Sequence, residues 1–359
     1  MDATHLEAVV RRDAALLEDD LAVFLGGLSG DLKDSVYAAA LERSLYTPVA
    51  DALGSKVGQQ ALPPAAGAPG GRAPLRPSMV YWAYRNYRGF TEEPDSADLA
   101  VIRRTAVAVR ILLKAAVVLD DIQDGSAVRY GEPALHATHG VPVALNTGSW
   151  LIMAALRHVA DPAVTDSLVG SVGRGFTGQA ADMATRSAEA QAELLAASRA
   201  ERVRFWESVA AHKTGTLFWM PLDAALAGLR VVEEERRTLD EAMRRLGLAS
   251  QLFNDLTDVV PEFGGANEDF DGLSNRVSLE LLGPAPEEDA RSYVLGHPRL
   301  PGLLRDLSAE AAELKRSAKE LVHGVCRSEA SAAYFDITID RKGHLIDRLC
   351  ETLRQRGDT

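Results

Sequence analysis

Apolar residues recur at the three- and four-residue spacing of an α-helix along almost the whole chain of 359 residues. The runs AVIRRTAVAVRILLKAAVVLDD and EEERRTLDEAMRRLGLASQLFNDL show this period, whereas alternating runs of the strand type are nearly absent. Alanine, leucine, arginine and glutamate dominate these runs and favour helices. The pattern predicts an all-α protein, with helices at about 4–25, 31–52, 77–90, 96–121, 142–159, 163–185, 190–212, 214–228, 233–260, 302–325 and 328–355.

Two stretches break the helical pattern. Residues 58–77, GQQALPPAAGAPGGRAPLRP, hold too much proline and glycine for a regular element, and a second irregular stretch begins at Pro261. Neither stretch separates halves of different composition. We therefore expect one domain over residues 1–359.

Charge and cysteine content exclude several classes of function. The net charge of −12 argues against a general nucleic-acid binder, which needs a basic face. Two cysteines, Cys326 and Cys350, are too few for a disulfide framework or a four-cysteine zinc site, so a reducing cytoplasm is expected. No stretch reaches the roughly 18 apolar residues of a membrane span, and the N-terminus does not resemble a signal peptide.

A first carboxylate cluster follows the apolar run KAAVVL directly. Asp120 and Asp124 share one face of a helix, while Asp121 is rotated by about a quarter turn or more. An isolated DDxxD is often a solvated helix end. Carboxylates this close repel one another, however, and Mg²⁺ between them would also hold substrate phosphates. Arg129, which follows, is placed to hold a diphosphate.

A second cluster closes another long apolar helix. Its sequence, Gln251-Leu252-Phe253-Asn254-Asp255-Leu256-Thr257-Asp258, has oxygen ligands at i and i+4. Two such clusters at the ends of apolar helices favour a metal site more strongly than either cluster does alone.

With both clusters in view, the sequence resembles the trans-prenyl diphosphate synthases, the polyprenyl synthetase family of class I isoprenoid synthases. Further landmarks that agree in order are Asn146-Thr147-Gly148, Gly178-Gln179-Ala180-Ala181-Asp182, Lys213-Thr214-Gly215 and Asn275-Arg276-Val277-Ser278. The resemblance covers about residues 70–285. It implies the isoprenoid synthase fold, an antiparallel helical bundle around a deep apolar cavity with both clusters at its mouth. It also implies a homodimer and Mg²⁺, three ions per site.

The resemblance assigns roles to individual residues. Its metal ligands would be Asp120, Asp124, Asn254, Asp255 and Asp258, with Asp121 in support. Its diphosphate-binding cations would be Arg129, Lys213 and Arg276, and Gln251 and Gln179 match polar positions near the leaving diphosphate. The catalytic set is then Asp120, Asp121, Asp124, Arg129, Lys213 and Gln251. Together, metals and cations would stabilise the leaving pyrophosphate so that an allylic C–O bond ionises.

The half of the family pattern that binds isopentenyl diphosphate is altered here. Arg72 and Arg76 match its basic loop only if one extra residue is tolerated. Leu113 stands where the family has His or Gln, and Tyr130 stands where it has a second arginine. Leucine offers no hydrogen bond and tyrosine no charge, so the acceptor either binds weakly or is not isopentenyl diphosphate.

The second cluster also departs from the family. Asn254 replaces the usual aspartate, and Asn254, Asp258 and Glu262 are similar to the NDxxSxxxE metal motif of class I terpene cyclases. Pro261 turns the chain, so whether Glu262 is a ligand stays open. Asn267 stands at the position of a further family lysine. Ala115 and Ala116 stand where bulky aromatic residues in this family block chain growth, so the resemblance implies room for a C15 or C20 prenyl chain.

Three functions are compatible with these residues. The first is a Mg²⁺-dependent trans-prenyltransferase of isoprenoid biosynthesis, which transfers an allylic prenyl group to isopentenyl diphosphate or another nucleophile. The alternative is a class I terpene cyclase that forms a cyclic terpene with loss of pyrophosphate. A non-catalytic regulatory subunit is the third, and the retained carboxylates argue against it.

Overall fold

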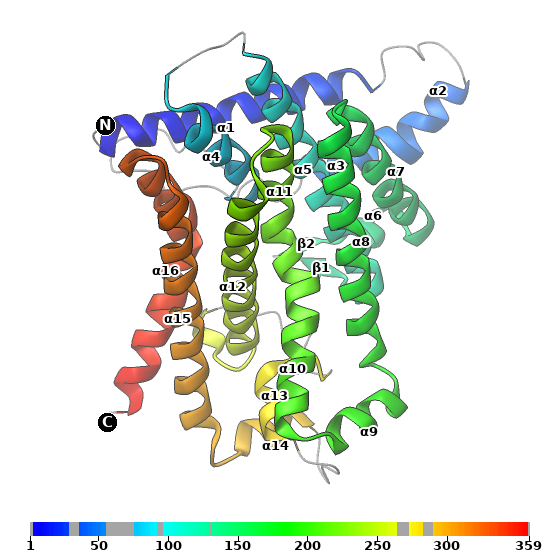
Figure 1. Cartoon of the computed structure of the whole chain (residues 1–359). Helices are drawn as coiled ribbons and strands as arrows, with labels where there is room; N and C mark the ends of the chain where they lie inside the picture. The colour runs from blue at the N-terminus through cyan, green and yellow to red at the C-terminus, as the bar shows by residue number, and fades with distance from the viewer. Residues whose placement is uncertain are drawn as a thin grey trace. The chain divides into compact units, whose positions relative to one another are not determined.

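The computed structural model describes residues 3–28, 36–54, 75–91, 96–129, 131–263, 273–282 and 290–357. The described part of the chain is almost entirely helical (Figure 1), and it forms two compact units, each assembled from separate parts of the sequence. Unit 1 comprises Met1–Val169, Met220–Val231 and Cys326–Thr338, and unit 2 comprises Gly170–Trp219, Val232–Val325 and Ile339–Thr359. The expected all-α architecture is confirmed.

Unit 1 is built around one buried helix. Its elements are α1 (Ala3–Gly26), α2 (Val36–Leu41), the π-helical turn η1 (Glu42–Tyr46), α3 (Thr47–Gly54), α4 (Leu75–Arg88), α5 (Ala97–Gln123), α6 (Leu135–His139) and α7 (Val141–Val159). Helix α5 packs against α4 and α7, and every residue from Thr105 to Leu112 is buried. Apart from Thr105 and Arg110 these residues are apolar, as expected of a helix segment in such a central position.

Unit 2 contains the second long helix pair. Its elements are α9 (Ala188–Ala196), α10 (Arg199–Ala210), the π-helical turn η3 (Ala211–Gly215), α12 (Glu233–Thr257), the 3-10 turn η4 (Pro261–Phe263), α13 (Arg276–Leu281), α14 (Ala290–Gly296) and α15 (Leu300–Val325). Helix α12 packs against α15. Leu239, Met243 and Leu246 lie three and four residues apart on its buried face, whereas the opposite face is charged.

Three helices continue from one unit into the other along the chain. They are α8 (Pro162–Ala184), α11 (Thr216–Gly228) and α16 (Glu329–Gly357). The C-terminal part of α16 is amphipathic, as an element of a dimer interface would be. Its apolar side chains Ile346, Leu349 and Leu353 instead belong to the buried core of unit 2, so this face is used within the chain.

The prediction of one helix over 190–212 is wrong. The chain leaves the helix at Ala197, and Ser198 begins α10 with a capping box: its hydroxyl accepts from the Glu201 N–H, and the Glu201 side chain accepts from the Ser198 N–H. Such a reciprocal cap satisfies two otherwise unpaired amides. Conversely, the predicted break between two helices at residue 213 does not occur, because η3 joins α10 to α11.

Several short elements had no signal in the sequence pattern. Val128–Arg129 (β1) and Glu132–Pro133 (β2) form a two-stranded antiparallel ribbon, and α6, α13 and α14 are brief helices. Helix α12 also ends at Thr257, before the expected residue 260. Among the described residues, none of the helices combines the length and apolar character that crossing a membrane requires.

Candidate active site

The first carboxylate cluster lies in the last turn of α5, in unit 1. Asp124 terminates the helix, and its backbone N–H donates to the Asp120 carbonyl at 2.8 Å. The chain then turns back, because the Ser126 N–H donates to the Asp121 carbonyl at 2.9 Å. This turn leads into the β1–β2 ribbon, which carries Arg129.

Arg129 bridges two of the three carboxylates. Its Nη2 lies 2.8 Å from Asp120 Oδ2, and its Nε donates to Asp121 Oδ1. Asp121 is almost fully buried, whereas 24% of the Asp120 side chain stays exposed. A forked guanidinium between two carboxylates neutralises their repulsion. The structure thus brings Asp120, Asp121 and Arg129 together and pairs the cation with the carboxylates, and the diphosphate-binding role of Arg129 stays a prediction.

Lys213 lies in the π-helical turn η3 of unit 2. Its ammonium donates to Asp182 Oδ2 at 2.7 Å, and 26% of the lysine side chain is exposed. Helix α8 approaches this turn closely, since a Cβ added to Gly178 would meet the Lys213 backbone nitrogen at 2.6 Å. Only glycine fits there. In the landmark Gly178–Asp182, the glycine therefore allows α8 to approach the backbone of Lys213, and the aspartate pairs with its ammonium.

The second cluster ends α12, and its members differ in environment. Asn254 is exposed, whereas Asp258, the residue that follows the helix, is 9% exposed. Asp255 is buried and accepts three hydrogen bonds: from Trp206 Nε1 at 2.8 Å, from Gln251 Nε2 at 2.8 Å and from the Arg276 backbone N–H at 2.7 Å. These contacts favour an anchoring role for Asp255, and its role as a metal ligand stays a prediction.

Gln251 connects this anchor to the π-helical turn. Its Oε1 accepts from the Thr214 hydroxyl at 2.6 Å, while its amide nitrogen donates to Asp255. Both ends of the amide are therefore fixed. Gln179 is buried in the same unit.

Arg276 is predicted to hold diphosphate, but the structure places its side chain in a buried ion cluster. Its Nε donates to Glu280 at 3.1 Å, its Nη2 lies 3.8 Å from Glu310, and its guanidinium stacks on Trp206 at 5.2 Å. Burial would raise the pKa of Glu280, but hydrogen bonds and charge from Arg199 and Arg276 outweigh it and hold that pKa below its usual value. Burial raises the pKa of Glu310.

Several predicted residues are placed elsewhere or lie outside the described residues. Arg72, Tyr130 and Asn267 are among the latter. Arg76 is partly exposed in the first turn of α4. Glu262 pairs with Arg356 of α16, and that hydrogen bond lowers the pKa of Glu262. The carboxylate of Glu262 thus forms a salt bridge with Arg356, and its role as a metal ligand stays open.

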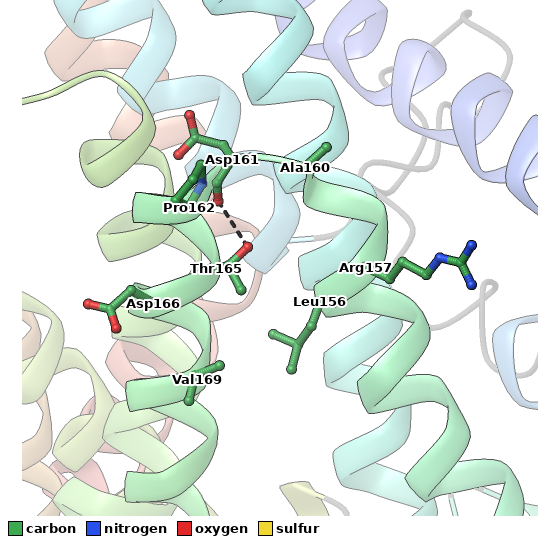
Figure 2. Close-up of a pocket in the computed structure, with 8 residues that line it drawn as sticks. All are labelled: Leu156, Arg157, Ala160, Asp161, Pro162, Thr165, Asp166 and Val169. Atoms are coloured by element: carbon green, nitrogen blue, oxygen red, sulfur yellow. Dashed lines mark hydrogen bonds between the residues drawn. The ribbon is translucent and has the colours of Figure 1, made fainter.

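An open hollow of about 480 Å³ lies in unit 1, where α7 turns into α8. In Figure 2, Leu156 of α7 and Val169 of α8 point into the gap between the helices, and Arg157 points away. Asp161 shapes the turn: it accepts from the Ala163 N–H at 3.0 Å and pairs with Arg230. No predicted site residue lines this hollow.

The donors present suit a hard divalent cation. Carboxylate oxygens dominate both clusters, and among the residues described no three His, Cys, Asp or Glu side chains converge on one point. Mg²⁺ is commonly bound in this way, by one or two carboxylates with water and substrate phosphates completing its shell.

Comparison with known proteins decides the family. The family model described as Polyprenyl synthetase matches residues 65–270, more than half of the chain. The chain belongs to the polyprenyl synthetase family. This confirms the resemblance drawn from the two clusters and the landmarks between them.

The curated relatives include proteins named as fusoxypene, variediene and geranylgeranyl diphosphate synthases. Fusoxypene synthase of Fusarium oxysporum is 28% identical over 163 residues, 43% of this chain and 21% of that protein. Variediene synthase of Aspergillus brasiliensis is 24% identical over 242 residues, 64% of this chain and 31% of the relative. Geranylgeranyl diphosphate synthase of Pantoea ananas is 27% identical over 250 residues, 68% of this chain and 77% of the relative. The chain thus spans only a fifth to a third of the fungal enzymes.

Solved structures of the polyprenyl synthetase family share the fold. Heptaprenyl diphosphate synthase from Staphylococcus aureus superposes with a TM-score of 0.65 at 16% identity, over 93% of this chain and 98% of that one. A polyprenyl synthase from Caulobacter crescentus, solved with calcium and isoprenyl diphosphate, gives 0.63 at 20% identity, over 93% and 96%. The isoprenoid synthase fold is therefore confirmed.

The sequence analysis missed three contacts around the site. The structure pairs Lys213 with Asp182 and Arg276 with Glu280, and Trp206 donates to Asp255. The pair of Arg276 and Glu280 had a local signal, because an arginine and a glutamate four residues apart pair on a helix.

Proposed function

We propose that this protein is a Mg²⁺-dependent prenyltransferase that ionises an allylic prenyl diphosphate of C15 to C20 length and joins the prenyl group to an acceptor. The observation that carries this proposal is the bridge from Arg129 to Asp120 and Asp121 at the end of α5, in a member of the polyprenyl synthetase family. In this proposal, the residues that would bind metal and the cation that would bind diphosphate lie next to one another at the end of α5.

The reaction breaks the allylic C–O bond, and its electron pair leaves with the diphosphate. The π electrons of the acceptor then attack the allylic cation, and a proton is lost. Bound Mg²⁺ would stabilise the charge on the departing diphosphate. The residues that would hold the metal are those that the resemblance implies, Asp120, Asp124, Asn254, Asp255 and Asp258, and the resemblance implies three ions.

Arg129 has a second role in this proposal. It pairs with Asp120 and Asp121 and neutralises their repulsion. With a diphosphate bound, its guanidinium would exchange these carboxylates for phosphate oxygens and donate to them where charge develops. Lys213, which pairs with Asp182, would make the same exchange in unit 2.

A terpene cyclase is the second candidate. Asn254 in place of aspartate and the altered acceptor positions Leu113 and Tyr130 favour it. The fungal relatives named as fusoxypene and variediene synthases point the same way. In a cyclase the attacking double bond belongs to the same prenyl chain, so a second substrate is not needed.

One experiment separates the two candidate functions. Purified protein is incubated with Mg²⁺ and farnesyl or geranylgeranyl diphosphate, with and without isopentenyl diphosphate, while pyrophosphate release and the organic extract are followed. Longer diphosphates formed only with isopentenyl diphosphate support the transferase, and hydrocarbons or alcohols formed without it support the cyclase. Tyr130→Arg should improve the use of isopentenyl diphosphate if that site is only weakened.

The metal assignment has its own test in Asp124→Ala. Asp124 closes α5 through its backbone N–H, which alanine keeps, so the fold should persist. We expect pyrophosphate release to fall by about a hundredfold or more, the scale of losing one preorganised electrostatic group. Asp306→Ala, an exposed carboxylate on α15, is the control. Full activity of the Asp124 variant would contradict the assignment.

We further propose a homodimer in the cytoplasm. Val141, Leu145 and Met153 on α7 and Val169 on α8 are each about half exposed or more, which is unusual for large apolar side chains in one neighbourhood. A second copy of unit 1 would cover them. Sedimentation of the unchanged chain and of Met153→Glu checks this, and a monomer in both cases would contradict it.

A further inference from the structure

Asn275 has more hydrogen bonds than a helix cap needs. It is fully buried at the start of α13, and its Oδ1 accepts from the Val277 N–H at 2.8 Å and the Ser278 N–H at 3.4 Å. Those two bonds are the ordinary work of an asparagine at this position. Its amide nitrogen is not needed for capping.

That amide nitrogen reaches back to the end of α12. It donates to the Asp255 carbonyl at 3.0 Å and to Asp258 Oδ2 at 3.3 Å. A third bond runs in the same direction, because the Arg276 N–H donates to Asp255 Oδ2 at 2.7 Å. The start of α13 therefore donates three hydrogen bonds to the end of α12, through the adjacent residues Asn275 and Arg276.

The consequence for Asp258 is geometric. A carboxylate that ends a helix has several rotamers available, and one hydrogen bond from a buried, rigid donor selects among them. Asn275 is held from both sides, since its oxygen is fixed by α13 and its nitrogen by the Asp255 carbonyl. It is thus a donor that does not move with the carboxylate.

We propose that Asn275 is a positioning residue that fixes the Asp258 carboxylate for metal–diphosphate binding. This inference rests on the proposed function, because it takes Asp258 as a metal ligand. Donors behind a ligating carboxylate orient it and typically change metal affinity by about 10- to 100-fold when removed.

The test separates capping from positioning. Asn275→Ser and Asn275→Thr keep a side-chain oxygen that caps α13 but lose the amide donor, whereas Asn275→Ala loses both. Ser198→Ala removes the cap of α10 in the same unit and serves as the control for lost capping. Binding of Mn²⁺ in the presence of inorganic pyrophosphate is measured by electron paramagnetic resonance, together with melting temperature.

We expect Mn²⁺ affinity to fall by about tenfold or more in all three Asn275 variants. Melting temperature should fall by about 2–4 °C in Ser198→Ala, which loses a cap alone. It should also fall in Asn275→Ser and Asn275→Thr, because the Asp255 carbonyl loses a buried donor, and fall further in Asn275→Ala, which loses the cap as well. Unchanged Mn²⁺ affinity in the Ser and Thr variants would show that Asn275 only caps and would overturn the inference. No pyrophosphate-dependent Mn²⁺ binding in the unchanged chain would overturn the proposed function itself, and the inference with it.

Discussion

Trp206 donates its indole N–H to the Asp255 carboxylate at 2.8 Å, and so ties α10 to the end of α12. Both residues are almost completely buried. The indole ring also lies under the Arg276 guanidinium, so one side chain contacts the acidic anchor and the neighbouring ion cluster.

Trp206→Phe should therefore lower the free energy of unfolding by more than the smaller volume of the phenylalanine side chain would explain. Phenylalanine keeps most of the packing but leaves a buried carboxylate short of one donor, which costs about 1.5–3 kcal/mol. Chemical unfolding measures this loss. In a double-mutant cycle with Asp255→Asn, the two changes should be strongly non-additive, and simple additivity would show that the hydrogen bond contributes nothing.

The bridge at Arg129 predicts opposite effects on two kinds of metal binding. In Arg129→Gln, Asp120 and Asp121 lose the cation that neutralises them, so Mn²⁺ alone should bind more tightly. With inorganic pyrophosphate present, the same variant should bind the metal–diphosphate more weakly, because a phosphate contact is missing. Titration of Mn²⁺ with and without pyrophosphate measures both. Shifts of the same sign would contradict the proposed exchange.

The ion cluster at Glu280 predicts a stability difference that depends on pH. Glu280→Gln leaves Arg276 buried beside a neutral partner, which should cost about 3–5 kcal/mol near pH 7. The pKa of Glu280 is lowered in the folded protein, so its contribution is complete above the unfolded value of about 4.3 and is lost as the pH falls through the folded value.

Melting curves of the unchanged chain and Glu280→Gln should therefore converge only below about pH 4.3. Glu320→Gln, which removes an exposed partner of Arg316 on α15, should change stability by less than about 1 kcal/mol. A Glu280 difference that stays constant down to pH 3 would contradict the ion-pair explanation.

Two glycines on α8 should respond to the same substitution with opposite signs. Gly178→Ala brings a methyl group to 2.6 Å from the Lys213 backbone nitrogen, so α8 must shift, at a cost of about 1–3 kcal/mol. Gly173→Ala meets nothing within 4 Å and should stabilise the helix by about 0.5–1 kcal/mol. Unfolding of both variants by denaturant is the measurement, and equal signs would rule out the close approach.

Periodicity was enough to predict the helices because it is a local property of the chain. Both carboxylate clusters were also visible, since their spacing lies within one helix turn. The break at Ser198 had a signal in the sequence, a serine followed three residues later by Glu201, but the apolar period on both sides concealed it.

The contacts that give the site its shape were not visible in the same way. Asp255 takes its donors from Trp206, Gln251 and Arg276, and only Gln251 is near in sequence. Nothing in a pattern distinguishes such a carboxylate from the exposed Asn254 beside it, because burial is decided by which helices pack together. The two-residue strands of the ribbon that carries Arg129 are likewise too short to give a period.

The π-helical turn at Ala211–Gly215 is equivalent to one residue inserted into an otherwise continuous helix. Removing one residue there, for instance His212, would let α10 and α11 continue in their present phase as a plain α-helix. The deletion would also alter the close packing of this turn against Gly178, and the ammonium of Lys213 would rotate away from Asp182. One extra peptide unit thus sets the direction of the Lys213 ammonium without changing the phase of the two helices, so the direction of this cation and the course of the helices can change separately.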